Sequence, residues 1–312
     1  MNNQLTVSSS PHIRCNDTTR RIMLDVLIAL LPTTVAGCVI FGLGALAVIA
    51  ASVIGALLSE FLFNLITKRE NSLGDLSAAV TGLILALNLH ANTPWWQCLI
   101  GSAFAIVVVK CLFGGLGHNF ANPAVTGRIF LLISFAGSVG GAAFPTVVDL
   151  EATSTPLETL ASGAADSLPS LTDMFIGLRG GAIGEVCLAA ILLGCAYLVL
   201  RRVIRVEVPL AFVLTVFLLS LILTNDPKLA LYHIMSGGLL FGAVFMATDY
   251  VTTPITRTGK IVFAVGCGII TVLIRFYGSY PEGVSFSILL MNILSPYIEK
   301  WTAKKPLGGK SA

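Results

Sequence analysis

The sequence predicts an all-α integral membrane protein with about ten transmembrane helices, on two observations. Of its 312 residues, 55% are hydrophobic and only 11% are charged. A soluble domain carries roughly 25% charged residues, so this chain cannot cover a water-facing surface. Its apolar stretches approach the roughly 20 residues with which a helix crosses a bilayer, and they lack the alternation of barrel strands. The expected helices are Ile22–Phe41, Leu43–Ile66, Leu76–Leu89, Gln97–Phe113, Ala124–Val139, Ala182–Leu200, Val208–Leu223, Leu229–Ala247, Ile261–Phe276 and Val284–Ile298.

Polar segments divide these helices into two groups of five. The first apolar run begins only after Arg20-Arg21, which argues against a cleavable signal peptide. The third expected helix is short and carries polar residues, so we expect a broken helix there rather than a plain span. The predicted organisation is a cytoplasmic N-terminal segment (1–21), a first five-helix repeat (22–139), a polar loop (140–181), a second five-helix repeat (182–298) and a cytoplasmic tail (299–312).

The distribution of Lys and Arg predicts the orientation in the membrane. With the N-terminus in the cytoplasm, 16 of the 19 basic residues fall inside, and Arg179, Lys228 and Arg275 fall outside. Cytoplasmic loops are enriched in basic residues, so this orientation is strongly favoured. Both termini are then cytoplasmic and the acidic loop 140–181 is extracytoplasmic. Because the first group of helices starts inside and the second starts outside, the two would be inverted repeats.

Two motifs carry glycine, asparagine and threonine at the predicted inner face. In "FGGLGHNFANPAVTGR" (113–128) the glycines permit a tight backbone, and Asn122-Pro123 suits a helix start. This stretch could be a tight turn between packed helices or a half-helix of the aquaporin type, although no second copy occurs. Its last residue, Arg128, is counted among the inside residues, as is Lys110. The second motif, "SGGLLFGAVFMATDYVTTPITRTGK" (236–260), weakly echoes the first repeat: "TDYVTTP" and "NLHANTP" (88–94) leave equivalent helices.

Ionisable residues inside predicted spans are candidates for an ion pathway, because charges are costly in a bilayer and usually face a cavity or a partner. Asp249 is the strongest, since Thr248 and other small or polar residues surround it. Asp25, in the first helix, is a further candidate. The polar residue Asn88, at the exit of the third helix, is another. For Asp25, as for Glu60 and Glu185, an interfacial position or a structural pair is the alternative.

Metal sites are not expected. The seven cysteines contain no C-x-x-C, which argues against a local iron–sulfur or zinc motif and leaves them as apolar packers. His90 and His233 are both predicted near the outer face, where bis-imidazole haem ligation is an alternative. A net charge of +3 gives no indication of nucleic-acid binding.

The polar loop contains "DLEATSTPLETL" (149–160). A threonine that precedes proline is held in an extended or turn conformation, because proline disfavours helix in the residue before it. Such a threonine would expose its hydroxyl to a modifying enzyme. The spacing alone does not separate this from an ordinary solvated loop.

Nearly the whole chain resembles the RnfD subunit of the Rnf complex and its relative NqrB of the sodium-pumping NADH:quinone reductase. The resemblance rests on "GGLGHNFANPAVTGR", "FMATDYVTTP" and "VDLEATSTPL", in this order and at suitable distances. It implies a urea-transporter-like fold of two inverted repeats in a bacterial inner membrane.

The resemblance also implies that FMN is joined by its phosphate to Thr155, through a flavin transferase that acts outside the membrane. This stretch departs from the family's Ser/Thr-Gly-Ala-Thr pattern, with Ala152, Thr153 and Ser154 before the acceptor position. Thr153 and Ser154 therefore remain alternative attachment points. We expect Arg179, near the start of the sixth helix, to offer a cation to the flavin phosphate.

The implied function is that of a membrane subunit of an ion-translocating ferredoxin:NAD oxidoreductase, which couples electron transfer to Na⁺ or H⁺ movement. The chain lacks a nucleotide-binding glycine fingerprint and a cysteine cluster, so we expect it not to be catalytic alone. The implied partners are iron–sulfur, NADH-binding and second flavin-bearing Rnf subunits. A second, non-covalent flavin is a further expectation. The alternatives are a passive channel or solute transporter without flavin, and a purely structural subunit.

Overall fold

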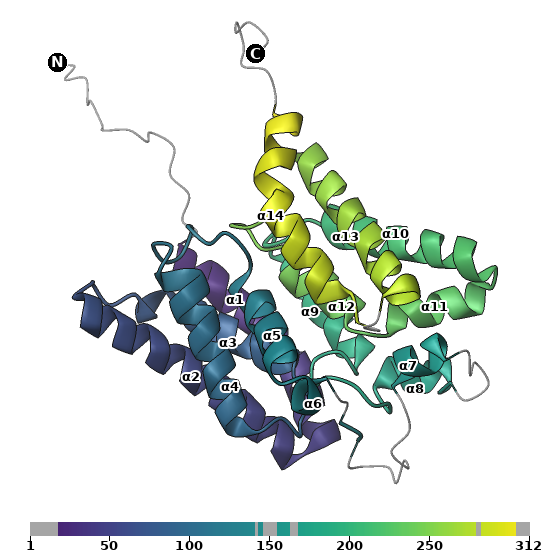
Figure 1. Cartoon of the computed structure of the whole chain (residues 1–312), viewed down its shortest axis with the longest axis horizontal. Helices are drawn as coiled ribbons and strands as arrows, with labels where there is room; N and C mark the ends of the chain where they lie inside the picture. Colours follow the sequence, from purple (N-terminus) through teal and green to yellow (C-terminus); the bar gives the residue numbers. More distant parts are fainter. Residues whose placement is uncertain (1–17, 141–142, 146–154, 163–167, 279–281, 304–312) are drawn as a thin grey trace, which may run out of the picture.

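The protein is all-α in the parts that the computed structural model describes, which are residues 18–140, 143–145, 155–162, 168–278 and 282–303. Within these ranges the only β pairing is an isolated bridge between Ala143 and Gly181. The elements, shown in Figure 1, are α1 (Thr19–Phe41), α2 (Leu43–Thr67), η1 (Leu73–Asp75), α3 (Ser77–Leu87), α4 (Trp95–Ala103), η2 (Phe104–Cys111), α5 (Pro123–Ser134), α6 (Ala136–Val139), α7 (Pro156–Ala161), α8 (Leu171–Ile176), α9 (Leu188–Leu200), α10 (Glu207–Thr224), α11 (Pro227–Met235), α12 (Leu239–Phe241), η4 (Gly242–Met246), α13 (Arg257–Tyr277) and α14 (Val284–Thr302).

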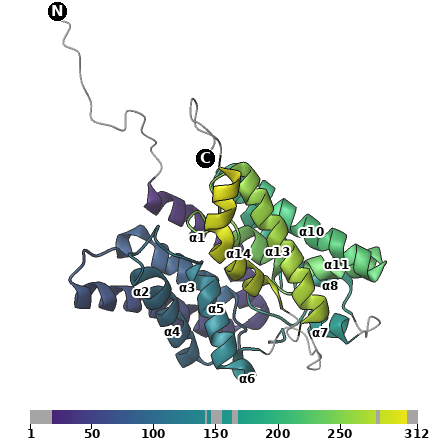
Figure 2. The same ribbon diagram turned by 45° about the horizontal axis from the view of Figure 1, so that its top comes forward.

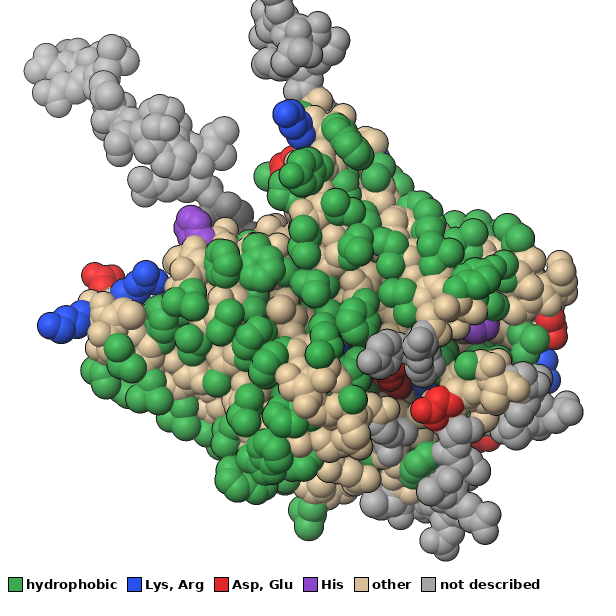
Figure 3. Space-filling view, viewed as in Figure 1, with side chains coloured by type: hydrophobic (Ala, Val, Ile, Leu, Met, Phe, Trp, Pro, Cys, Tyr) green, Lys and Arg blue, Asp and Glu red, His purple; other side chains and the backbone are tan. Residues whose placement is uncertain are grey.

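The outer surface of the bundle is apolar. Leu43, Ile66 and Leu200 are each more than three-quarters exposed. Figure 3 shows one face of the molecule that is mostly hydrophobic, with charged side chains gathered in a few places toward its ends. In water such a surface would be unfavourable, whereas lipid tails accept it. The chain is therefore an integral membrane protein, as its composition predicts.

Four helices, α1, α2, α10 and α13, are long and apolar enough to cross a membrane, among the residues that the structure describes. The bent pair formed by α11 with α12 and η4 would make a fifth span. Each of the ten predicted segments contains a helix, but several of these helices are too short to meet the length expected of a simple span.

The packing of the helices follows the same pattern in both groups. In the first group α2 packs against α3 and α4, and in the second α10 packs against α11 and α13. The groups meet where α1 packs against α9 and α5 packs against α14. Gly194 allows this approach, because a Cβ there would collide with the carbonyl oxygen of Ala29 in α1. The start of α1 and the end of α14 lie on one side of the molecule, opposite α6, α7 and α8 (Figures 1 and 2).

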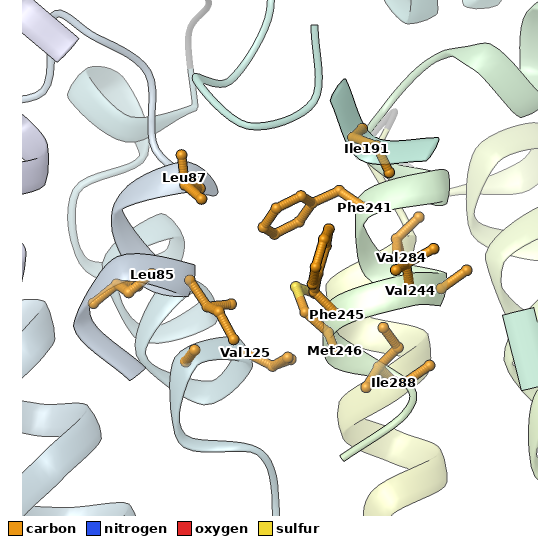
Figure 4. Packing of buried hydrophobic residues seen from close by; sticks show 14 of the residues in the cluster. Leu85, Leu87, Val125, Ile191, Phe241, Val244, Phe245, Met246, Val284 and Ile288 are labelled. Carbon is orange, nitrogen blue, oxygen red and sulfur yellow. The ribbon is translucent and has the colours of Figure 1, made fainter. Parts of the chain in front are cut away.

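The central core lies between α3 and the segment formed by α12 and η4. Figure 4 shows Leu87 of α3 on the side of the rings of Phe241 and Phe245, whose centroids are 5.1 Å apart, while Leu85 points away from them. Both rings are buried. Two short helices thus meet at the centre of a bundle whose long helices form its outer walls.

Three predicted helices differ from the observed ones. The sixth begins at Leu188 rather than Ala182, because residues 182–187 form turns whose amides bind the end of α3: Ile183 N donates to Leu89 O at 2.9 Å and Gly184 N to Leu87 O at 2.7 Å. The fifth is divided at Phe135 into α5 and α6. The eighth, expected to be continuous, is bent by 60° between α11 and α12.

Candidate functional site

A left-handed residue precedes a short apolar helix in each group, α3 in the first and α12 in the second. Leu76, which precedes α3, has φ 65° and ψ 3°, and Gly238, which precedes α12, has φ 64° and ψ 15°. Left-handed backbone stops a helix and turns the chain, and a non-glycine residue adopts it only at a cost. Helix α3 is short but continuous after Leu76, whereas the eighth predicted helix is broken by 60° between α11 and α12, a break that we did not expect.

Arg275 of α13 holds the break in the eighth helix. Its guanidinium donates to the carbonyl oxygens of His233 at 2.5 Å, Ser236 at 2.9 Å and Gly237 at 3.4 Å. These carbonyls lie at and just beyond the end of α11, where they lack helical partners. A buried cation therefore caps α11 and fixes the direction in which α12 starts.

The two sequence motifs meet across the two groups of helices. The side chain of Asn122 caps α5 by accepting from Ala124 N at 3.0 Å and Val125 N at 3.3 Å. Its amide nitrogen donates to Met246 O, 3.4 Å away, at the end of η4. Asn292 of α14 bridges the same region when its amide is oriented to satisfy both neighbours, with Thr252 O 3.2 Å away and Asn122 N 3.1 Å away. Asn122-Pro123 starts a helix, as predicted, and also joins the second motif.

A cavity of about 90 Å³ lies where these motifs meet. Its walls come from α1, α3, α9 and η4, together with residues of the Asn-Pro and Thr-Asp motifs. Asp249 is the single charged residue among the described residues that line it, and Thr248 lines it as well. Asp249 accepts hydrogen bonds from Val251 N at 3.3 Å and Thr252 Oγ1 at 3.0 Å. A carboxylate at the edge of a mainly apolar cavity suits a proton or a small cation.

Asn88 belongs to a polar network next to this cavity. Its amide nitrogen donates to Ile84 O at 2.7 Å and contacts Met246 Sδ at 3.2 Å, and its oxygen accepts from Arg128 Nη1 at 3.1 Å. Arg128 also donates to Ser285 Oγ at 3.1 Å and pairs with Glu282. The network therefore joins the end of α3 to the start of α14.

Arg128 and Lys110 correct the assignment of charges made from the sequence. Both were counted among cytoplasmic residues, yet both side chains are buried. Lys110 Nζ lies 2.8 Å from Glu60 Oε1 and 2.6 Å from Ser77 Oγ, and Arg128 pairs with Glu282. The sequence did contain a signal for the Lys110–Glu60 pair, because a basic and an acidic residue lie inside two different predicted helices.

Asp25 makes a structural pair between α1 and α9. It accepts from Tyr197 Oη at 2.9 Å, and from Arg201 Nε at 3.3 Å and Nη2 at 3.2 Å. Asp25 does not line the Asp249 cavity. Its contacts favour the structural alternative considered for it.

Thr155 lies at the N-terminus of α7. Its Oγ1 accepts a hydrogen bond from Glu158 N at 3.2 Å, and its own amide donates to Glu158 Oε2 at 2.8 Å, which makes a capping box. Thr155 is partly exposed, and its oxygen acts here as an acceptor. A phosphoester formed at Thr155 Oγ1 would leave this oxygen able to accept the hydrogen bond from Glu158 N. It would also place a negatively charged phosphate at the start of α7, where the Glu158 carboxylate repels it. Thr153 and Ser154 lie outside the described residues.

Helix α7 rests against the break in the eighth helix. A Cβ on Gly237 would lie 2.9 Å from Leu157 Cδ2 and 2.8 Å from Arg275 Nη2. Arg275 is thus a basic residue near α7 that the sequence pattern did not single out. Arg179, which it did, is 2% exposed, and its Nη2 donates to Glu185 O at 2.7 Å.

The histidines and cysteines form no metal cluster in the described ranges. His233 packs on Phe276 with ring centroids 4.9 Å apart, and His90 Nδ1 lies 3.4 Å from Thr93 Oγ1. The six cysteines within these ranges are free and at least partly buried.

The chain is similar over nearly its whole length to the members of one protein family. Residues 6–308 match the model of the NQR2, RnfD, RnfE family. The chain is 46% identical to the D subunit of the Na⁺-translocating ferredoxin:NAD⁺ oxidoreductase complex of Acetobacterium woodii, over 97% of this chain and 95% of that protein. It is 39% identical to the D subunit of the proton-translocating ferredoxin:NAD⁺ oxidoreductase complex of Clostridium ljungdahlii, over 98% and 97%. The D subunit of the ion-translocating oxidoreductase complex of Stutzerimonas stutzeri is also 39% identical, over 90% and 89%.

Proposed function

This chain belongs to the NQR2, RnfD, RnfE family, and we propose that it is the membrane subunit of an ion-translocating ferredoxin:NAD oxidoreductase complex. In this proposal electrons pass through FMN esterified to Thr155, and their passage is coupled to the movement of Na⁺ or H⁺. The relatives named above are subunits of ion-translocating oxidoreductase complexes, one described as Na⁺-translocating and another as proton-translocating.

The position of Thr155 is the observation that carries the flavin proposal. The threonine immediately before Pro156 starts a short helix with a partly exposed side chain, as an acceptor for a modifying enzyme requires. Bound FMN would supply the capacity to accept and pass on one or two electrons. This chain would supply the attachment point on α7, and α7 in turn is supported by α11 and the break at Gly237.

Arg275 and Arg179 are candidate cations for the flavin region. Arg275 is bound to three carbonyl oxygens beside Leu157, whereas Arg179 binds one carbonyl and its Nε makes no hydrogen bond within the described ranges. Arg179→Ala should lower flavin occupancy or change the flavin redox potential if this side chain holds the phosphate. Unchanged values would remove Arg179 from the proposal.

The proposed architecture is two inverted five-helix repeats with ten membrane-embedded helices. The shared packing pattern of the two groups and the left-handed breaks before α3 and α12 support it. In a bacterial inner membrane both termini would be cytoplasmic and α7 extracytoplasmic. The positions of α7 and α8, opposite the start of α1 and the end of α14, support this orientation (Figure 1).

The proposed ion pathway includes Asp249 and Thr248, which line the Asp249 cavity, and Asn88, which lies beside this cavity. The cavity borders the seam between the two groups, so a small relative movement of the groups would change its shape. We also propose that a second, non-covalent flavin contacts this chain. Because Asp25 is held by Tyr197 and Arg201, its proposed role in the pathway is secondary.

The proposed partners are the other Rnf subunits, which would bring the iron–sulfur clusters, the NADH site and a second covalent flavin. A flavin transferase would act on Thr155 before or during assembly. Within the described ranges no group of three or more His, Cys, Asp or Glu residues could hold a metal ion.

Mass spectrometry of the peptide 147–160 from membrane-matured protein tests the attachment. We expect an FMN adduct on Thr155, and in-gel flavin fluorescence that Thr155→Val abolishes. Thr172→Val, an exposed threonine in the first turn of α8, is the matched control and should keep the fluorescence. A peptide without adduct and a colourless denatured protein would favour the channel or transporter instead. Unaltered electron flux through the whole complex in Thr155→Val would favour a structural subunit.

A further inference from the structure

A second cavity, of about 100 Å³, lies beside the Asp249 cavity and is lined by three basic side chains. Arg202 and Arg205 come from the turn between α9 and α10, and Lys260 comes from the first turn of α13. Nothing in the proposed redox function uses these residues. Their convergence from two separate parts of the chain is the observation from which this inference starts.

The wall of this basic cavity is fixed by backbone contacts. Arg202 has a positive φ of 57°, which turns the chain sharply after α9. Val203 N then donates to Leu198 O at 2.9 Å, and the hydroxyl of Tyr250 donates to Val203 O. Tyr250 therefore fastens the segment after η4 to the α9–α10 turn, and the two arginines are presented on a rigid loop.

The positive charge in the basic cavity is not balanced by ion pairs. Two acidic residues near it are bound by other arginines: Asp25 by Arg201 at 3.2 Å and Glu207 by Arg257 at 2.7 Å. A third, Asp249, lies between the lining residues Thr248 and Tyr250, but it lines the neighbouring cavity and not this one. Arg202, Arg205 and Lys260 make no ion pair within the part of the chain that the structure describes. The second oxygen of Glu207 is buried without a hydrogen bond there and offsets one charge in part. An excess of positive charge remains.

The cavity lies at the end of the bundle that carries the start of α1 and the end of α14. The Asp25–Arg201 pair connects it to α1, and Thr256 Oγ1 lies 2.7 Å from Thr302 Oγ1 of α14. Apolar side chains flank it, since Leu200 is 82% exposed and Val206 is 47% exposed. A lipid that lies against these side chains would bring its headgroup to the cavity.

We propose that this cavity binds a phosphate group, and that the headgroup of an anionic phospholipid in the cytoplasmic leaflet supplies it. Two guanidinium groups and an ammonium group, held around one concavity, match the geometry of phosphate oxygens. Basic pockets at the cytoplasmic ends of membrane helices attract anionic headgroups, and each nearby Lys or Arg contributes about a fivefold gain in binding. Free phosphate is the other source of the same chemistry.

The test uses the full chain together with its copurifying subunits, in nanodiscs of pure phosphatidylcholine or of phosphatidylcholine mixed with phosphatidylglycerol. The readouts are the phosphatidylglycerol content that gives half of the thermal stabilisation, and the lipid retained in native mass spectrometry. Arg205→Gln with Lys260→Gln should raise the half-point about thirtyfold, because two charges are lost. Lys300→Gln removes an exposed cation at the same end of the bundle but outside the cavity. This control variant should leave the half-point unchanged.

The outcomes separate the sources. Stabilisation by phosphatidylglycerol, but not by inorganic phosphate at millimolar concentration, supports the lipid headgroup. Equal stabilisation by inorganic phosphate supports the phosphate site but overturns the lipid as its source. The proposal is overturned if the double variant behaves like Lys300→Gln. It is also overturned if the double variant retains lipid and instead loses a copurifying subunit, because the cavity would then contact an acidic protein.

Discussion

Lys110 Nζ of η2 lies 2.8 Å from Glu60 Oε1 of α2, with both side chains at most 2% exposed. Ser77 Oγ at the start of α3 and Ser72 Oγ before η1 bind the same pair, at 2.6 Å each. Burial of an ion pair is costly, and hydrogen bonds to the pair offset part of this cost. Here the bonds to Glu60 all go to its Oε1, and Glu60 Oε2 has no hydrogen-bond partner among the described residues. Through Ser77 this pair fixes the place where the short helix α3 begins.

Lys110→Met should destabilise the protein strongly, because it leaves the Glu60 carboxylate buried without its cation. Removing one partner of a buried pair costs roughly 3–5 kcal/mol. The double variant Lys110→Met with Glu60→Met should recover most of this loss, since no charge remains. Thermal unfolding in detergent measures both. Losses that simply add in the double variant would show that the two residues do not stabilise each other.

Gly237→Ala should destabilise the break in the eighth helix. The backbone there has φ 66°, and the new Cβ would lie 2.8 Å from Arg275 Nη2 and 2.9 Å from Leu157 Cδ2. The left-handed backbone alone costs roughly 1–2 kcal/mol for a residue with a side chain. Gly137→Ala, in α6, is the control, since a Cβ there meets nothing within 4 Å. Equal melting temperatures for the two variants would contradict this account of the break.

Thr155→Asn should separate helix capping from flavin attachment. Asparagine is a strong N-cap residue, so α7 should keep its start, but its amide cannot form the phosphoester. We expect loss of flavin fluorescence with assembly of the complex intact. Thr155→Val should lose the flavin and, in addition, roughly 1 kcal/mol of local helix stability. Flavin on the asparagine variant would move the attachment to Thr153 or Ser154.

Asp249→Asn should impair ion-dependent turnover, because it removes the charge from the central cavity while keeping its size. Electron transfer from NADH or ferredoxin, assayed with and without an ion gradient, measures the coupling. Asp226→Asn is the matched control: Asp226 caps α11 by accepting from Lys228 N at 2.8 Å, and asparagine preserves such a cap. Normal coupling in Asp249→Asn would exclude this residue from the pathway.

Features that depend on local pattern and composition could be read from the amino-acid sequence alone. Long apolar runs bounded by charges predict membrane helices wherever they occur, because the cost of exposing backbone to lipid leaves few other structures. The helix start at Asn122-Pro123 and the interruption before Ser77 were predictable for the same reason, since caps and breaks are encoded within a few residues. Thr155 before Pro156 likewise stands out locally and is indeed a helix start.

Which charges meet depends on the packing of the helices in three dimensions. Lys110 and Arg128 were counted as cytoplasmic residues although both lie inside predicted helices. Helix packing brings Lys110 to Glu60, 50 residues away, and Arg128 to Glu282, 154 residues away. The break at Gly237 is likewise held by Arg275, 38 residues further along the chain. Such pairs arise from how helices pack rather than from any local pattern, because desolvation makes a buried charge depend on whatever partner the fold brings within reach.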